Sequence, residues 1–432
     1  MLQSKPISKG VDWLVVFLYA VLVFIGIVCI FMVEYKPGMN PVTSFLEGKT
    51  GYSKQLMFAG ICVVLATFIL LSDSKLYTAF ANLFYAFGIL LMLATFVIGK
   101  SVNGSKSWIP LGGGFNLQPA EVCKIFTALA LAKYMSLQDL DFSKTRTQII
   151  AAAIALFPAM LSRLQHETGL ALVYLCFFIA MYREGLPAMV LIIGFSFSVL
   201  VVATLLVDKN LLAAILTVVA GIIGYLMWRQ IKRNRVILVY IVLIWGFCVG
   251  IQRFAVPYIF NNVFECYQSQ RIYMAVGREY DCSENKASKH LAPGAKLPHQ
   301  ADDYNVRESK IAIGSGGFFG KGFLKGTQTR GKYVPEQNTD FIFTSLGEAF
   351  GFIGCSVLMC IYIVLLLRIV WIAERQRSTF SRVYAYSVAS ILFYHVTVNV
   401  CMTIGLFPSI GIALPLMSYG GSSLGAKAPK KA

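Results

Sequence analysis

Long runs of apolar residues, each near the length of a membrane-crossing helix, restrict the possible folds of this sequence more than any other feature. About 20 apolar residues cross a bilayer as a helix. Apolar residues make up 57% of the chain and charged residues only 14%, well below the charged fraction of a soluble domain. We therefore predict an all-α polytopic membrane protein. The apolar runs lie at about 11–33, 55–72, 78–99, 118–135, 148–162, 168–183, 188–207, 211–229, 236–260, 341–367 and 384–405.

The basic residues indicate which ends of these segments face the cytoplasm. The net charge is +17, and dense Lys/Arg clusters lie in the short loops at 229–235 and 368–383. Such loops stay on the cytoplasmic side. Counting crossings from a cytoplasmic N-terminus puts both clusters inside and residues 261–340 outside. These loops are too short for the continuous basic face that nucleic acid requires, so we expect contacts with membrane lipids and no nucleic-acid partner.

The chain divides into four predicted parts. Residues 1–260 hold the N-terminal transmembrane helices, and 261–340 form one large extracytoplasmic loop. Residues 341–424 hold the C-terminal helices and a re-entrant SYGGSS segment, and 425–432 form a basic tail. The count of crossings places this tail outside, against the charge rule. A final helix is therefore expected to be missing, and the tail is interpreted as a truncation or a cloning scar.

Two of the ten cysteines, Cys266 and Cys282, lie in the predicted extracytoplasmic loop. Disulfides persist in extracytoplasmic compartments. The sequence leaves both a bonded pair and two free thiols open. No CxxC or His-rich spacing typical of a metal site occurs.

Ionisable residues stand at the outer ends of several predicted helices. Glu121 and Lys124 in LQPAEVCK are three residues apart, so they share a helix face and can pair. The alternatives are a capped helix with one ion pair and a functional intramembrane pair. Glu167 in QHETGLAL precedes another apolar helix, and N-capping is its simpler explanation.

A glycine-rich stretch, SKIAIGSGGFFGKGFLKGTQTRGKY, precedes the next apolar run. Its GKGF sequence lacks the Ser/Thr of a phosphate-binding P-loop. The other interpretation is that these glycines allow a tightly folded backbone. Lys321 and its basic neighbours would place positive charge on the outer face, near a lipid pyrophosphate, or would form an ordinary solvated loop.

Asp340, in VPEQNTDFIF, lies where water ends and an apolar run begins. It could cap the following helix or take part in chemistry. Ser345 and Glu348 have the spacing of a capping box, which would leave Asp340 free for catalysis. Farther along, Pro408, Pro415 and paired glycines predict non-helical backbone at membrane depth, which is tolerated where protein buries it or where it lines a cavity.

Taken together, these motifs resemble the SEDS proteins (shape, elongation, division and sporulation), and among them RodA more than FtsW. The matching stretches are NGSKSWI with LQPAEVCK, QHETGLAL, SKIAIGSGGFFGKGF, VPEQNTDFIFTSLGEAFGFIG and GLFPSIGIALPLMSYGGSS. The family fold has ten transmembrane helices with a large loop before the eighth. This implies an extra helix pair here, around 188–260.

The resemblance implies a peptidoglycan glycosyltransferase that polymerises lipid II during cell-wall elongation in the bacterial cytoplasmic (inner) membrane. A class B penicillin-binding protein is the implied partner. A divalent cation, Mg²⁺ or Mn²⁺, is expected, and no organic cofactor. Asp340 matches the family's essential aspartate and is the expected general base. The residues expected to bind substrate or support the site are Glu121, Lys124, Trp108, Lys321, Glu336 and Ser418.

The sequence departs from the family in two motifs. QPDLGTA is replaced by QHETGLA, which changes His166, Glu167 and Leu170, and Ser107 stands where a basic residue usually precedes Trp108. These changes leave the roles of Glu167 and Ser107 open.

A lipid II flippase is the main alternative function. A transporter should show an internal repeat and polar residues along a whole path. Here the polar motifs gather on the outer side, which favours chemistry there. A scaffold for the penicillin-binding protein would leave Asp340 unexplained.

Overall fold

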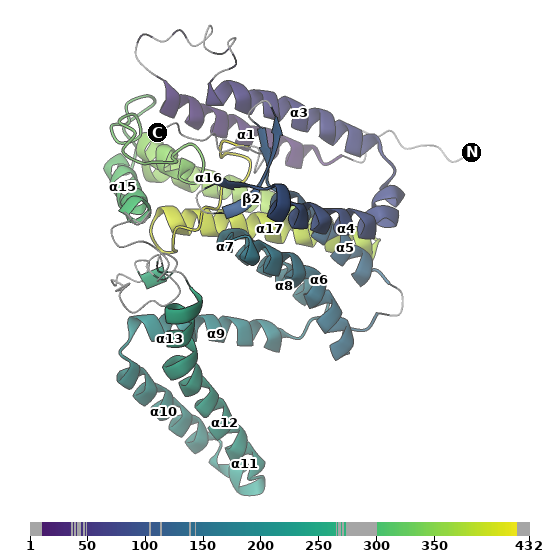
Figure 1. The fold of residues 1–432 in the computed structure, drawn as a ribbon, viewed down its shortest axis with the longest axis vertical. Coiled ribbons are helices and arrows are strands. Elements are labelled where there is room, and N and C mark those ends of the chain that lie inside the picture. The colour runs from purple at the N-terminus through teal and green to yellow at the C-terminus, as the bar shows by residue number, and fades with distance from the viewer. Residues whose placement is uncertain are drawn as a thin grey trace, which may run out of the picture. The chain divides into compact units, whose positions relative to one another are not determined.

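The computed structural model describes residues 11–35, 38, 40, 45, 48, 50–102, 105–112, 115–137, 140–142, 144–264, 266, 269, 272–273 and 300–420. Within these residues, nine helices are long and apolar enough to cross a membrane, and a shorter apolar helical stretch covers Thr168–Arg183. Each predicted apolar run coincides with helix (Figure 1). The predicted all-α membrane fold is therefore confirmed.

Two compact units make up the chain. The first comprises residues 1–187, 305–404 and 409–432, and the second comprises 188–304 and 405–408. The helices of the first unit are α1 (Trp13–Glu34), α3 (Gly51–Leu71), α4 (Ser74–Ile98), α5 (Pro119–Met135), α6 (Thr145–Leu164), α7 (Thr168–Val173), α8 (Phe177–Arg183), α15 (Gln300–Gly316, whose first residues belong to the second unit), α16 (Ile342–Glu374) and α17 (Thr379–Thr403). The four-part division predicted from the sequence stays a prediction.

Local sequence signals explain where several helices begin. The Asp12 carboxylate caps α1 by accepting from the Val15 N–H at 3.3 Å, and Asp73 does the same for α4 through Lys75 at 3.0 Å. Pro119 starts α5, where its missing N–H costs nothing. An aspartate before the apolar run, or a proline at its first position, thus marks these helix starts.

Helix α17 is central to the first unit and packs against α16, α5 and α8. A second contact joins α1 to α16. Arg368 pairs with Asp12 at one end of α1, and Asn338 reaches Glu34 at the other. The two helices are therefore antiparallel, as the predicted topology requires. Buried residues between and around these helices include Leu22, Ile30, Ile342, Leu346, Tyr362 and Leu414.

A kink interrupts α16 at Gly351, which has φ 62° and ψ −157°. A Cβ added there would lie 2.4 Å from the Gly320 nitrogen. Gly320 itself has φ +83°, and an added Cβ would lie 2.2 Å from the Ala349 oxygen. Only glycine fits both demands. The glycine-rich loop therefore folds tightly against α16, as the sequence predicts.

Two features of this unit were not predicted. A small antiparallel sheet of order β1-β2-β3 precedes α5, with strands Lys100–Val102, Ser105–Gly112 and Phe115–Leu117. The stretch predicted as one loop, 261–340, contains helix α15. Short strands between long apolar runs carry little periodic signal, and α15 is too polar to stand out.

The second unit contains α9 (Ala188–Leu206), α10 (Lys209–Leu226), α11 (Trp228–Arg233), α12 (Val236–Gly250) and α13 (Val256–Tyr258). Helices α10 and α12 pack together, and Trp245 donates to Thr217 between them at 3.1 Å. Cys266 is disulfide-bonded, whereas Cys282 lies outside the described residues. The basic tail 425–432 also lies outside them.

Candidate functional site

Asp340 lies just before α16, where the chain turns out of the glycine-rich loop. Its side chain is buried, with 3% exposed. Asn399 of α17 donates to its backbone oxygen at 2.8 Å. Phe341 occupies the N-cap position of α16, so Asp340 stands one residue before the cap. The predicted position, directly before the apolar run, is the one that Asp340 occupies, and the carboxylate there is covered by protein.

A non-helical segment, residues 409–420, passes close to this carboxylate. A Cβ added to Gly411 would lie 3.5 Å from Asp340 Oδ2. Asn399 also donates to the Ile412 oxygen at 2.7 Å. Gly169 of α7 approaches the segment so closely that an added Cβ would lie 2.3 Å from the Ile410 oxygen. Neighbouring helices therefore hold the segment in place beside Asp340.

Ser418 holds the C-terminal end of segment 409–420 in place through hydrogen bonds. Its hydroxyl donates to the Thr339 oxygen at 2.6 Å and accepts from the Leu414 N–H at 2.8 Å. Gln55 of α3 donates to the Ser418 oxygen at 3.3 Å. The predicted non-helical backbone is confirmed for residues 409–420, and protein side chains satisfy several of its polar groups. Ser418 thereby fixes the residue directly before Asp340.

Glu34, at the end of α1, is a carboxylate that the sequence analysis did not select. It accepts from the Gly51 N–H at 2.7 Å and from the Asn338 side chain at 3.3 Å. Asn338 in turn accepts from the Tyr419 N–H at 2.7 Å through its backbone oxygen. Glu34 thus connects α1 and α3 to the segment that carries Asp340.

Glu336 turns the backbone toward Asp340. It has φ 55°, which is unusual for a residue other than glycine. Its oxygen accepts from the Thr339 N–H at 3.0 Å and from the Phe341 N–H at 3.3 Å. Through its backbone, therefore, Glu336 supports the turn that presents Asp340.

Glu121 and Lys124 form the predicted pair on α5, with Lys124 Nζ 2.9 Å from Glu121 Oε2. Lys124 is 4% exposed. Its Nζ also lies 2.8 Å from His395 Nε2 on α17. The pairing is confirmed, and it gains a third, buried member. His395 was missed, although an ionisable residue in an apolar run is itself a signal.

The strand β2 meets the start of α7 through Ser107 and Glu167. The Ser107 hydroxyl donates to Glu167 Oε1 at 2.6 Å. Glu167 stands at the N-cap of α7, but its side chain makes no capping hydrogen bond, so the N-capping explanation was wrong. Glu167 also lies within electrostatic range of Glu121. Trp108, the next residue on β2, is buried.

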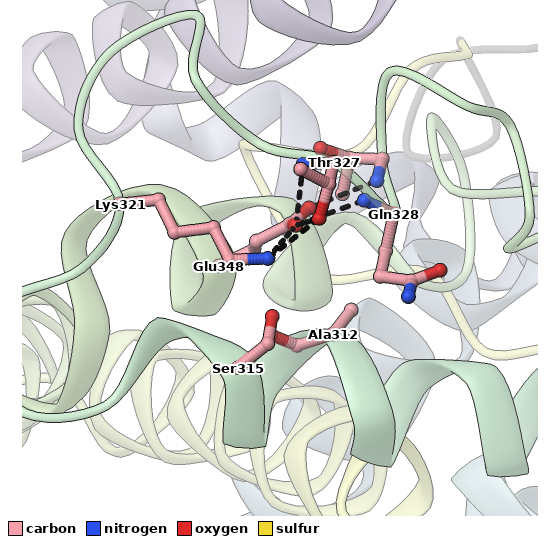
Figure 2. A network of polar contacts seen from close by, with 7 residues as sticks. Ala312, Ser315, Lys321, Thr327, Gln328 and Glu348 are labelled. Atoms are coloured by element: carbon pink, nitrogen blue, oxygen red, sulfur yellow. Dashed lines mark hydrogen bonds and ion pairs between the residues drawn. The ribbon is translucent and has the colours of Figure 1, made fainter.

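Glu348, which the sequence analysis placed in a capping box, is fully buried within α16. Figure 2 shows it surrounded by the loop that carries Lys321, Thr327 and Gln328. Its Oε1 accepts from Lys321 Nζ at 2.8 Å, from Thr327 N at 2.7 Å and from Gln328 N at 2.9 Å. Its Oε2 accepts from Thr329 N at 2.8 Å. The cluster is an internal anchor for the loop.

This anchor changes two interpretations of the sequence. The capping box of Ser345 and Glu348 was wrong, because Glu348 binds the loop instead of the start of α16. The amides that a phosphate loop would turn toward its ligand here face the Glu348 carboxylate, which argues against the phosphate-loop alternative. Lys321, with 25% of its side chain exposed, is likewise held by Glu348.

No set of three or more His, Cys, Asp or Glu side chains within the described residues is arranged to hold a metal ion.

The structure brings the predicted site residues into three neighbourhoods. Asp340, Glu336 and Ser418 form one, Glu121 and Lys124 the second, and Lys321 the third. The face of α17 that carries His395 and Asn399 joins the first two.

Known proteins resemble this chain over most of its length. The FtsW/RodA/SpoVE family model, described as a cell cycle protein, matches residues 12–240 and 199–428. The chain is 31% identical over 438 residues to the peptidoglycan glycosyltransferase RodA of Treponema pallidum, covering 96% of this chain and 94% of that protein. It is also 31% identical over 351 residues to the peptidoglycan glycosyltransferase MrdB of Escherichia coli K12, covering 81% and 75%.

A solved structure of a peptidoglycan synthase complex contains a chain with the same fold. The TM-score is 0.63 at 23% identity, and the match covers 95% of this chain and 93% of that one.

Proposed function

The chain belongs to the FtsW/RodA/SpoVE family and is a peptidoglycan glycosyltransferase, and we propose that it polymerises lipid II with Asp340 as general base. The observation that carries this proposal is the position of the Asp340 carboxylate. It stands beside segment 409–420, in a junction where α1, α3 and α17 all fix the surrounding backbone.

Glycosyl transfer needs a proton acceptor at the sugar that attacks. In the proposed step, the 4-hydroxyl oxygen of the acceptor sugar bonds to the anomeric carbon of the donor sugar, and its proton passes to the Asp340 carboxylate. The bond between that carbon and the lipid pyrophosphate breaks, and the pyrophosphate leaves with the electron pair. Because Asp340 is buried, admission of the sugars requires the groups that cover it to shift.

Cationic groups stabilise the negative charge of a leaving pyrophosphate. Lys124 suits this role because it is buried and already oriented by Glu121. Lys321 suits it less, because Glu348 holds its ammonium. We assign Lys321 to supporting the loop, and Trp108, Glu336 and Ser418 to supporting the backbone around the site.

The divalent cation, Mg²⁺ or Mn²⁺, stays a prediction, and no step above passes through it. An assay of glycan synthesis with and without EDTA tests it.

Membership of the family supports a proposal for the cellular setting. The chain is a multi-pass membrane protein, and we place it in the bacterial inner membrane, acting in cell-wall elongation. Its proposed partner is a class B penicillin-binding protein, and the structural match to a chain of a peptidoglycan synthase complex supports an assembly of this kind.

The test separates a polymerase from a flippase. Purified protein and partner are incubated in vesicles with lipid II, and both glycan product and transfer of lipid II between leaflets are measured. We expect glycan chains that depend on the protein. Transfer between leaflets without glycan product would contradict the proposal and support the flippase.

A further inference from the structure

Lys124 and His395 form a contact of two ionisable side chains inside the helix bundle. Lys124 Nζ lies 2.8 Å from His395 Nε2, and His395 is 8% exposed. His395 reaches in the other direction as well, because its Nδ1 lies 3.3 Å from the Ala413 oxygen. The imidazole therefore bridges α5 and segment 409–420.

The chemistry of the two partners fixes the form of the imidazole. A lysine ammonium only donates hydrogen bonds, and Lys124 donates one of them to Glu121 Oε2 at 2.9 Å. His395 Nε2 must then be the acceptor, so the single ring proton sits on Nδ1 and points to the Ala413 oxygen. One neutral tautomer satisfies both contacts, and the opposite tautomer satisfies neither.

The same face of α17 also contacts the backbone of Asp340, the proposed general base. Asn399, one helical turn after His395, donates to the Ile412 oxygen at 2.7 Å and to the Asp340 oxygen at 2.8 Å. Residues 412 and 413 are thus held by two side chains of one helix. One face of α17 therefore contacts both the Lys124 ammonium and the backbone of Asp340.

Lys124 has one more N–H group than these two contacts use. An ammonium has three N–H groups, and across the described part of the chain Glu121 and His395 receive two of them. The directions of those two bonds determine where the third N–H points. An anionic substrate group would receive that third bond.

We propose that His395 is a positioning residue of the transferase site, which directs the Lys124 ammonium toward the pyrophosphate of the substrate while holding segment 409–420. This inference rests on the proposed function. His395 does not touch the reacting atoms in this account, because it acts through Lys124.

Two conservative variants separate the two contacts of the imidazole. The side-chain amide of glutamine reaches the position of Nε2, and that of asparagine reaches the position of Nδ1. His395→Gln therefore keeps an acceptor for Lys124, whereas His395→Asn keeps a donor for the Ala413 oxygen and loses the acceptor. A residue that only fills space would tolerate both changes equally.

The experiment measures KM for lipid II and kcat of glycan synthesis for wild type, His395→Gln and His395→Asn. We expect His395→Gln to stay within about threefold of wild type, and His395→Asn to raise KM roughly tenfold or more, the usual effect of losing a hydrogen bond to a charged group. Equal KM values for the two variants would overturn the proposal.

A double-mutant cycle keeps the test decisive if His395→Asn lowers expression or stability. The Kd for lipid II is measured for Lys124→Met with and without His395→Asn. We expect the histidine change to have no further effect once the ammonium is gone, and an undiminished effect would contradict the inference. Absence of glycan synthesis by the wild type would instead count against the proposed function.

Discussion

Replacing Glu348 by glutamine should release the glycine-rich loop. The carboxylate accepts four close donors, namely Lys321 Nζ and the amides of Thr327, Gln328 and Thr329, at 2.7–2.9 Å. An amide keeps one acceptor oxygen, so in either orientation at least one backbone N–H faces another donor. Lys321 also loses its charge partner.

The size of the effect follows from these contacts. A buried donor left unsatisfied costs about 1–3 kcal/mol, and weaker bonds to a neutral acceptor add roughly 1 kcal/mol. The loop should therefore lose about 2–4 kcal/mol of local stability. At about 1.4 kcal/mol per tenfold change, amide exchange at residues 327–329 should accelerate by roughly 30- to 1000-fold.

Hydrogen–deuterium exchange with mass spectrometry measures this directly on the purified protein in detergent. Glu308→Gln on α15 is the matched control, because Glu308 has no ion pair within the described part of the chain. We expect exchange at 327–329 to change only in Glu348→Gln. Equal protection in wild type and Glu348→Gln would refute the anchoring role of this carboxylate.

Three further predictions concern the same unit. Gly169→Ala should lower glycan synthesis at least tenfold, because the added Cβ would lie 2.3 Å from the Ile410 oxygen and displace segment 409–420. Unchanged activity would show that the position of this segment does not limit catalysis. Asn399→Leu removes the donor that the Asp340 and Ile412 oxygens share and should lower stability by about 1–3 kcal/mol, measured by thermal unfolding; an unchanged midpoint would contradict this. The hydrogen bond from Arg368 lowers the pKa of the Asp12 carboxyl from 3.8. The ionised carboxylate therefore stabilises the folded protein above pH 3.8, and this stabilisation is lost as the pH falls through the lowered pKa. The stability difference between wild type and Arg368→Met should therefore be constant from about pH 7 to 5 and shrink below about pH 4, and a difference that shrinks between pH 7 and 5 would contradict it.

The sequence was sufficient for the membrane fold because the apolar runs are long and the basic loops are asymmetric. It was also sufficient for the Glu121–Lys124 pair, because a spacing of three residues fixes a shared helix face. Contacts within one helix are local, and local spacing predicts them.

Contacts between distant segments could not be predicted in the same way. The capping box of Ser345 and Glu348 failed because a buried loop competes for the same carboxylate, and spacing does not reveal that competitor. His395 and Asn399 were visible as polar residues four apart in an apolar run. His395 contacts Lys124 and Asn399 contacts Asp340, both far along the chain, so only the fold shows these contacts.

The central claim is that Asp340 accepts the proton of the attacking sugar. The most direct test measures single-turnover glycan formation and lipid II binding for wild type and Asp340→Asn, at saturating lipid II and with the partner present. We expect Asp340→Asn to lower the rate by roughly 10²- to 10⁴-fold and to bind lipid II within a few-fold of wild type. Glycan formation at the wild-type rate by Asp340→Asn would contradict it.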